Sequence, residues 1–271
     1  MQFKRFRVLT FSATLIGCSS SVFGAPLDCL ITPKSVVNLV ASDKGQIVEI
    51  AVARGDRVSK GDVLVRLDDS LQRLHVQMAK ARMESDVIER SSKVRLARRV
   101  KDLERAEKLL ERKVATATSV DDAEMEKALT ELAVEQAAID RQLSEIEYAQ
   151  ALALLDRRTI LSPSNGIVSA VRASVGEYAH EQLEILTIAE MDPLKVEVFA
   201  PISTYTEIEV GQIFDVVQNA PLDGVFQGQI QAIDQVFDAA SATFGLQLDL
   251  RNPDGSIPAG VRCRIDLLAP L

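Results

Sequence analysis

The sequence predicts an α+β protein that is mainly β. It has a long antiparallel α-helical coiled-coil hairpin inserted in a split β-sandwich, and a small β-barrel follows. Three observations predict this class. A β-rich motif occurs twice, the second copy 121 residues after the first. The intervening residues 70–157 contain no Gly and no Pro, so every strong helix breaker is missing. The last part, 192–271, again alternates apolar and polar residues, as short strands do.

The N-terminal residues 1–24 are predicted to be an export signal. They have a basic start, an apolar stretch at 8–16 and small residues before Ala25. The apolar stretch is shorter than the roughly 20 residues that a membrane span needs. Cys18 follows Leu-Ile-Gly, the pattern in which a cysteine becomes a lipidated N-terminus. The alternative is that Cys18 is an ordinary signal residue, removed by cleavage near Gly24.

The two copies of the repeat begin at Gly45 and Gly166. From each glycine, apolar residues and turn residues recur at the same distances, so that Gly55 in the first copy matches Gly176 in the second. Alternating apolar residues broken by turn signals predict a β-meander in each copy. One copy is too small to bury its apolar face, so we expect the two to face each other as a flattened sandwich.

The inserted residues 70–157 are predicted to form two helices of about forty residues each, reaching roughly 60 Å. Apolar residues follow three-and-four spacing in the first arm and a heptad register in the second. These are Leu71, Leu74, Met78, Ala81, Ile88, Leu96, Leu103 and Leu110, then Met125, Leu129, Leu132, Ile139, Leu143, Ile146 and Ala153. We expect them to form the seam between the arms, and Ser119 to cap the second arm. A stalk with no core beyond its seam is predicted to pack on copies of itself or on another protein.

Short strands punctuated by Gly and Pro in residues 192–271 predict a small barrel. The leader strand before the first copy is expected to complete this barrel beside the last strand. Cys29 and Cys263 would then be neighbours and could form a disulfide in an oxidising compartment. The alternative is two separate buried thiols.

Three segments together resemble the periplasmic adaptor family, the HlyD-type membrane fusion proteins of tripartite efflux and secretion systems. They are 45–64, with its Gly-Asp turns, the return motif 161–168, and the Asn-Pro-Asp-Gly segment 252–260 before the last strand. In this order around a helical segment, they support a likeness that covers essentially the whole mature chain. The resemblance implies a signal peptide at 1–24, a leader strand joining the barrel at 25–33, lipoyl-like half 1 at 34–68, an α-helical hairpin at 69–157, lipoyl-like half 2 at 158–191 and a β-barrel at 192–271.

The resemblance also implies a function. Such a chain would be a periplasmic subunit that forms a trimer or hexamer and links an inner-membrane transporter, of the RND or ABC type, to an outer-membrane channel. Many adaptors carry an Arg, a Leu four residues on and a Ser seven further on at the channel-docking hairpin tip. Arg105, Leu109 and Thr116 have this spacing here, with Thr in place of Ser. The alternative function is an exported scaffold or binding protein with the same fold and no channel partner.

Composition and motifs indicate that the chain is neither an enzyme nor a nucleic-acid-binding protein. Its net charge of -8 gives no basic face for phosphates. The two histidines, His75 and His180, have no metal-ligand spacing, and no nucleophile elbow or phosphate loop occurs. No cofactor is expected. The turn that carries the modified Lys in lipoyl carrier domains is replaced by the helical insertion, which argues against a carrier.

Overall fold

The computed structural model describes residues 26–219 and 224–267, and the chain divides into two compact units. One unit is formed by 34–191 and contains two β-sheets and three long helices. The other combines the segment before Lys34 with the segment from Asp192 onward and contains a closed β-barrel. The predicted mixed α/β class with a barrel is therefore confirmed.

Two four-stranded sheets form the β part of the first unit. Their orders are β2-β9-β7-β4 and β6-β5-β3-β8. The strands are β2 (Ser35–Val40), β3 (Gly45–Ile50), β4 (Arg57–Val58), β5 (Val63–Leu67), β6 (Thr159–Leu161), β7 (Gly166–Val171), β8 (Tyr178–Ala179) and β9 (Glu184–Glu190). The repeat is visible here, because β3 and β7 begin at the two equivalent glycines. Each sheet contains strands from both copies, so neither copy is complete without the other.

The matched glycines of the repeat have the same backbone conformation. Gly55 has φ +97° and Gly176 has φ +92°, a region that residues with a Cβ rarely adopt. Between the sheets, apolar side chains at alternate positions form one core, with Ile47, Leu64 and Ile185 fully buried. The glycines make the turns and the alternation fills the interior, as the repeat predicts.

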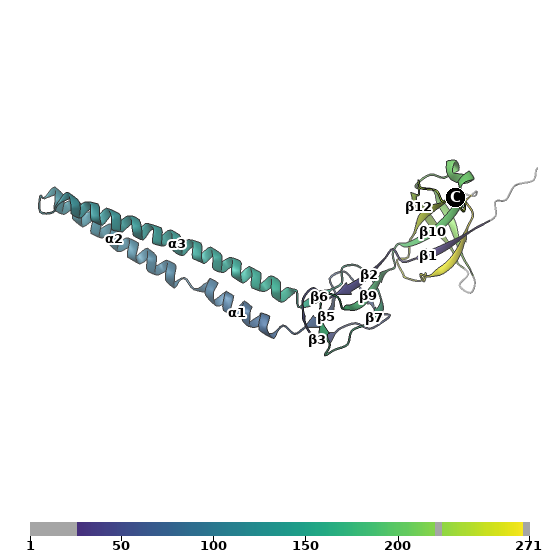
Figure 1. Ribbon diagram of the computed structural model, residues 1–271, viewed down its shortest axis with the longest axis horizontal. Helices are drawn as coiled ribbons and strands as arrows, with labels where there is room; N and C mark the ends of the chain where they lie inside the picture. The colour runs from purple at the N-terminus through teal and green to yellow at the C-terminus, as the bar shows by residue number, and fades with distance from the viewer. Residues whose placement is uncertain (1–25, 220–223, 268–271) are drawn as a thin grey trace, which may run out of the picture. The chain divides into compact units, whose positions relative to one another are not determined.

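The helices α1 (Ser70–Glu84), α2 (Val87–Glu111) and α3 (Ala117–Asp156) lie between β5 and β6 in the chain. Both α1 and α2 pack along α3 (Figure 1). The ion pairs Arg82–Glu147 at 3.5 Å, Arg141–Glu89 at 3.0 Å and Arg99–Glu126 at 3.2 Å show that the arms run antiparallel. Because β5 pairs with β6, both ends of the helical insertion are held at adjacent strands.

The first arm is two helices, where the sequence predicts one. The helix ends at Glu84 because Ser85 is extended, with ψ 109°, and its N–H donates to the carbonyl of Arg82 instead of continuing the helical pattern. Helix α2 begins two residues later. No Gly or Pro marks this break, so the breaker rule could not find it.

The prediction for the seam between the arms is wrong for most of its residues. On α3, the six large apolar residues in heptad register are 50–63% exposed, whereas the buried or half-buried positions are occupied largely by small or polar residues. These inward positions include Ala123, Thr130, Ala137, Ser144 and Ala151. In the first arm, Leu71, Leu74, Met78 and Ile88 are also exposed, and only Leu96 and Leu103 are half-buried as expected.

The second unit is a six-stranded closed barrel with the order β1-β10-β13-β12-β11-β14. Its strands are β1 (Leu27–Thr32), β10 (Leu194–Pro201), β11 (Ile213–Gln218), β12 (Val225–Ile233), β13 (Thr243–Leu250) and β14 (Val261–Ile265), with a 3-10 helix at Ile202–Glu207. Every second residue of β10 and β13 points inward, and Val196 and Leu248 are fully buried. Strand β1 pairs with both β10 and β14 and closes the barrel.

Candidate functional site

The hairpin tip is the turn that joins α2 to α3, and its backbone is tightly bonded. The N–H of Lys113 donates to the carbonyl of Leu110 at 2.8 Å, and the N–H of Val114 donates to the carbonyl of Leu109 at 2.9 Å. With Lys113 at φ +58°, this is a Schellman motif in which Lys stands where Gly is usual. The tip is therefore a fixed turn although it contains no glycine.

Thr116 is the N-cap of α3. Its Oγ1 accepts a hydrogen bond from the N–H of Ser119 at 3.3 Å, and the Ser119 hydroxyl donates back to the carbonyl of Thr116 at 2.6 Å. The prediction that Ser119 caps this helix is wrong, because the helix begins at Ala117. Thr and Ser are both preferred N-cap residues, so the sequence alone does not distinguish Thr116 from Ser119. In the structure the earlier residue, Thr116, is the N-cap.

Arg105 and Leu109 lie one turn apart on the last two turns of α2, so they share a face that leads to the tip. The Arg105 guanidinium is exposed and pairs with Asp102 at 3.2 Å, and Leu109 is 38% exposed. The Thr116 hydroxyl accepts from the backbone, which leaves its own proton free to donate. The tip thus offers a cation, an apolar side chain and a hydroxyl, which can bind a partner non-covalently but form no catalytic group.

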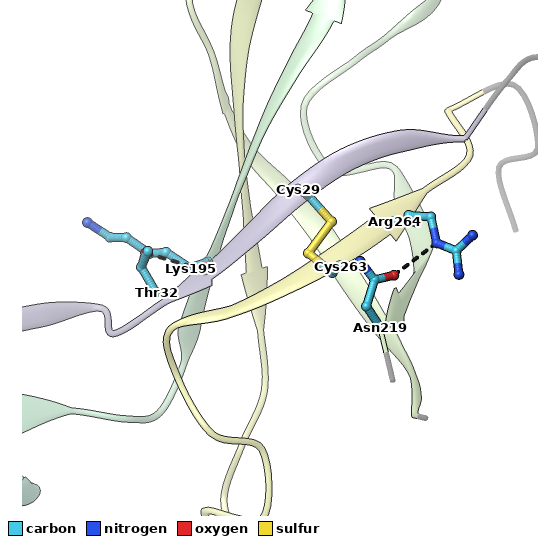
Figure 2. Close-up of a disulfide and its surroundings, with 6 residues drawn as sticks. All are labelled: Cys29, Thr32, Lys195, Asn219, Cys263 and Arg264. Carbon is cyan, nitrogen blue, oxygen red and sulfur yellow. Dashed lines mark hydrogen bonds between the residues drawn. A yellow bond between two sulfur atoms is a disulfide. The ribbon is translucent and has the colours of Figure 1, made fainter. Parts of the chain in front are cut away.

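The cysteine pair lies in the barrel. Cys29 on β1 and Cys263 on β14 are direct partners in the antiparallel register, their Cα atoms are 4.8 Å apart, and a disulfide joins them (Figure 2). Nearby, the Arg264 guanidinium donates to the side-chain oxygen of Asn219 at 2.9 Å, which links β14 to the end of β11. The disulfide joins two residues that are 234 positions apart in the sequence. Cys18, the third predicted site residue, lies outside the described residues.

A charged cluster between the arms was not predicted from the sequence. Glu89 of α2 accepts hydrogen bonds from Lys93 and from Arg141 of α3, and these bonds, Lys93 first, lower the pKa of the Glu89 carboxyl. The contact with Glu89, and after it the contact with Glu145, raises the pKa of Arg141. One signal existed, because Arg141 follows the small inward residue Ala137 by four and so shares its face of α3.

A groove of about 450 Å³ lies at the base of the hairpin, between α1 and α3, and it was also missed. His75, Met78 and Leu154 line it together with Gln72, Arg82, Glu147 and Arg158. Within the described residues, no group of three or more His, Cys, Asp or Glu side chains could hold a metal ion. None of the described helices is long and apolar enough to cross a membrane.

No protein-family model matches the chain. Two curated relatives are similar in sequence. An uncharacterised protein of Haemophilus influenzae is 25% identical over 242 residues, which are 89% of this chain and 56% of that protein. The nodulation protein NolF of Rhizobium meliloti is 25% identical over 231 residues, 85% of this chain and 59% of that protein. The chain therefore spans little more than half the length of these relatives.

Solved structures share the fold, and two of them are described here. MacA from Actinobacillus actinomycetemcomitans has a TM-score of 0.76 at 19% identity, over 91% of this chain and 79% of MacA. The membrane fusion protein Spr0693 from Streptococcus pneumoniae R6 has a TM-score of 0.58 at 20% identity, over 89% of this chain and 97% of Spr0693. The chain has the fold of these proteins.

Proposed function

We propose that this chain, which has the membrane fusion protein fold, is the periplasmic adaptor subunit of a tripartite export system. It would link an inner-membrane transporter, of the RND or ABC type, to an outer-membrane channel. One observation carries the proposal: a helical hairpin leaves and re-enters a two-copy sandwich through the adjacent strands β5 and β6. Nothing in such an arm serves catalysis, whereas a projecting arm suits the bridging of two partners.

In this proposal the parts have separate tasks. Residues 34–68 and 158–191 are the two lipoyl-like halves, 69–157 are the coiled-coil hairpin, and the barrel of 192–271 with the leader strand contacts the transporter. The export signal of 1–24 directs the chain to the periplasm. Cys18, if lipidated, would hold it at the inner membrane. Copies assemble as a trimer or hexamer, and the transporter supplies the energy for export.

The tip is the proposed contact with the channel. The Schellman turn and the Thr116 cap hold the ends of α2 and α3 together, so Arg105, Leu109 and Thr116 are presented from a fixed turn. A rigid presentation lowers the conformational entropy that binding must overcome. The exposed Arg105 guanidinium suits a carboxylate or a carbonyl of the partner, and Leu109 suits an apolar notch.

The experiment replaces Arg105 and Leu109 by Ala and follows export in cells that lack the wild-type chain. We expect export to be lost while the circular dichroism of the purified variant is unchanged, because both side chains are exposed. A composition-matched control replaces Arg73 and Leu74, also exposed but at the base of the hairpin, and should keep export.

A cysteine at Thr116 adds a direct readout. Thiol crosslinking in intact cells should recover an outer-membrane channel from this variant. If no channel is recovered and export is unaffected by deletion of the chain, the adaptor proposal fails and the exported scaffold takes its place. If the Arg105 and Leu109 variant unfolds, those residues pack the hairpin and the tip assignment is wrong.

A further inference from the structure

The base of the hairpin is held to the sandwich by a side chain as well as by the backbone. Arg158 lies between α3 and β6, and its side chain is only 12% exposed. The arginines that pair the two arms with each other, Arg82, Arg99 and Arg141, are 45–72% exposed. Arg158 therefore differs from the solvated charges of the hairpin, and its contacts deserve a structural explanation.

All three nitrogens of the Arg158 guanidinium have acceptors. Nη1 donates to the carbonyl of Lys44 at 2.5 Å, and Nη2 pairs with the Asp43 carboxylate at 3.2 Å. The side-chain oxygen of Gln72, turned toward the guanidinium, accepts from Nη2 at 2.6 Å and from Nε at 3.2 Å. Gln72 belongs to α1, and the other two residues belong to the loop 41–44 between β2 and β3. This set of bonds, here called the Arg158 contact, joins the end of the second arm to the first arm and to a loop of the sandwich.

The preceding residue binds the same loop. Arg157 Nη2 donates to the carbonyl of Ser42 at 3.1 Å, and the Ser42 hydroxyl donates back to the carbonyl of Arg157 at 3.2 Å. An arginine near the end of a helix often binds the last carbonyls of its own helix. Here both guanidinium groups bind the loop 41–44 instead, so they connect the hairpin to the sandwich.

Gly45, the first glycine of the repeat, leaves room for this contact. A Cβ at Gly45 would lie 2.7 Å from Nη1 of Arg158, whereas its next neighbour, the Cβ of Leu67, would be at an ordinary 3.6 Å. At the matching glycine, Gly166, a Cβ would lie 2.5 Å from the carbonyl oxygen of Ala189 on the paired strand. The second glycine thus permits a close backbone contact within a sheet, and the first leaves space for the guanidinium.

The position of the loop 41–44 gives the Arg158 contact a mechanical effect. Both backbone connections of the hairpin run into one sheet, through the neighbouring strands β5 and β6. Two adjacent connections of this kind leave a hairpin free to swing out of the plane of that sheet. The loop 41–44 joins β3 in this sheet to β2 in the other sheet. Bonds from the hairpin to this loop therefore oppose the swing.

We propose that Arg158 is a positioning residue, which holds both arms of the hairpin to the loop 41–44 and so fixes the direction of the hairpin relative to the sandwich. The length of the arm magnifies the effect. For the 40 residues of α3, a swing of about 10° at the base displaces the tip by about 10 Å. The value of a fixed direction rests on the proposed function, because a tip that is already aimed loses less conformational entropy when it binds a channel.

The experiment measures the direction of the hairpin in the purified chain. Cys18 is replaced by Ser, and Cys29 and Cys263 stay bonded to each other and buried. Spin labels are attached to Val36→Cys, exposed on β2, and to Glu135→Cys, exposed on α3. The labelled chain is diluted with unlabelled chain, so that pulsed dipolar spectroscopy reports the distance within one copy. The wild-type contact should give one narrow distance distribution.

Two variants remove the Arg158 contact in different ways. Arg158→Ala removes the guanidinium, and Gly45→Ala keeps it but places a methyl group where Nη1 lies. Each should widen the distribution to about twice its wild-type width, because a swing of about 10° moves a label about 30 Å from the base by about 5 Å. Arg158→Lys should also widen it, since an ammonium lacks the planar fork that binds several acceptors at once. The matched control, Arg66→Ala, removes an exposed arginine that pairs with Glu49 inside the sheet and should keep the wild-type width.

Hydrogen exchange of peptides from β3, β5 and β7 separates positioning from folding, and it should be unchanged in the variants. If Arg158→Ala alone loses protection, Gly45→Ala decides, because its methyl group meets only the end of a flexible side chain. Wild-type widths in both variants, or equal broadening in Arg66→Ala, would overturn the proposal. So would lost protection of the sandwich in both variants, which would make Arg158 part of its packing.

The Arg158 contact and the proposed function can fail separately. The distance measurement needs neither a channel nor a transporter. A widened distribution with undiminished export would keep the contact and refute its part in docking. Wild-type widths in the Arg158 and Gly45 variants, together with export that is lost when the tip is changed, would refute the contact and keep the docking proposal.

Discussion

The barrel and the hairpin use the same apolar residue types in opposite ways. In the barrel, Phe214, Leu248 and their neighbours are fully buried inside a closed sheet, and a disulfide joins two of the strands. In the hairpin, the only buried side chain among the three helices is Ala137, and most Leu, Ile and Met are exposed. The barrel is therefore stabilised by buried apolar contacts and a disulfide within one copy of the chain. The hairpin leaves much of its apolar surface exposed.

A matched pair of truncations tests this difference and has the largest expected effect. Leu248→Ala removes a fully buried side chain and should destabilise the barrel by about 2–5 kcal/mol. Leu132→Ala removes a side chain that is 60% exposed and should change the stability of the monomer by no more than about 0.5 kcal/mol. Hydrogen exchange of peptides from β13 measures the change in stability caused by Leu248→Ala, and exchange of peptides from α3 measures the change caused by Leu132→Ala. An equal cost would show that Leu132 is packed within one copy of the chain.

The disulfide gives the next effect. Replacing both Cys29 and Cys263 by Ala should destabilise the barrel by about 2–4 kcal/mol, because the bond limits the unfolded chain. The free energy of unfolding from urea titrations, with barrel peptides followed by hydrogen exchange, measures the loss. Exchange in α3 should not change, since the bond lies wholly in the barrel. A reducing agent should reproduce the loss in the wild type and have no effect on the double variant.

Removal of the N-cap at the tip should cost less stability than removal of the disulfide. Thr116→Ala removes the acceptor for the Ser119 N–H and should destabilise the start of α3 by about 1 kcal/mol, with faster exchange of its first turn. Thr116→Ser keeps the oxygen and should have a small effect. Thr118→Ala, two residues further on and exposed, is the control. Equal effects at Thr116 and Thr118 would argue against the cap.

The smallest effect concerns pH. Hydrogen bonds from Lys93 and Arg141 lower the pKa of Glu89 from 4.5, so its contribution to stability is complete above that value. The contribution is lost as the pH falls through the lowered pKa of the folded chain. The helical signal of the wild type should therefore fall more steeply below about pH 4.5 than that of Glu89→Gln. Glu107→Gln removes a carboxylate outside this cluster and should leave the wild-type slope; an unchanged slope for Glu89→Gln would contradict the role of the cluster.

The sandwich was the most predictable part. The equal spacing of Gly55 and Gly176 within the repeat predicts the turns, and the turns set where the strands begin. The exchange of strands between the copies follows from their size, because neither copy alone can cover its apolar face. Local turn chemistry and alternation agree in this region, and the structure agrees with both.

The seam between the arms was not predictable by the same means. A heptad pattern identifies one face of a helix, and it does not say which surface covers that face. On α3 two such faces exist, an exposed one with Leu132 and Ile139 and an inward one with Ala137 and Ser144. The prediction placed the larger apolar side chains in the seam, but their face of α3 is the exposed one. The smaller residues face the first arm.

For the tip, sequence alone supplies residue types and spacing but not geometry. The interval between Arg105, Leu109 and Thr116 indicated the end of the first arm, and the structure does place these residues around the turn. The Schellman bonds could not be foreseen, because Lys113 occupies a position where Gly is the usual signal.

The pairing of β5 with β6 has a consequence for how such a chain can evolve. The chain enters and leaves the hairpin through these two neighbouring strands, so removing or adding one heptad in each arm leaves the attachment and the tip unaltered. Arm length can therefore change without altering the sandwich or the tip. Under the proposed bridging function, export by variants shortened in equal steps in both arms would measure the distance that the hairpin has to span.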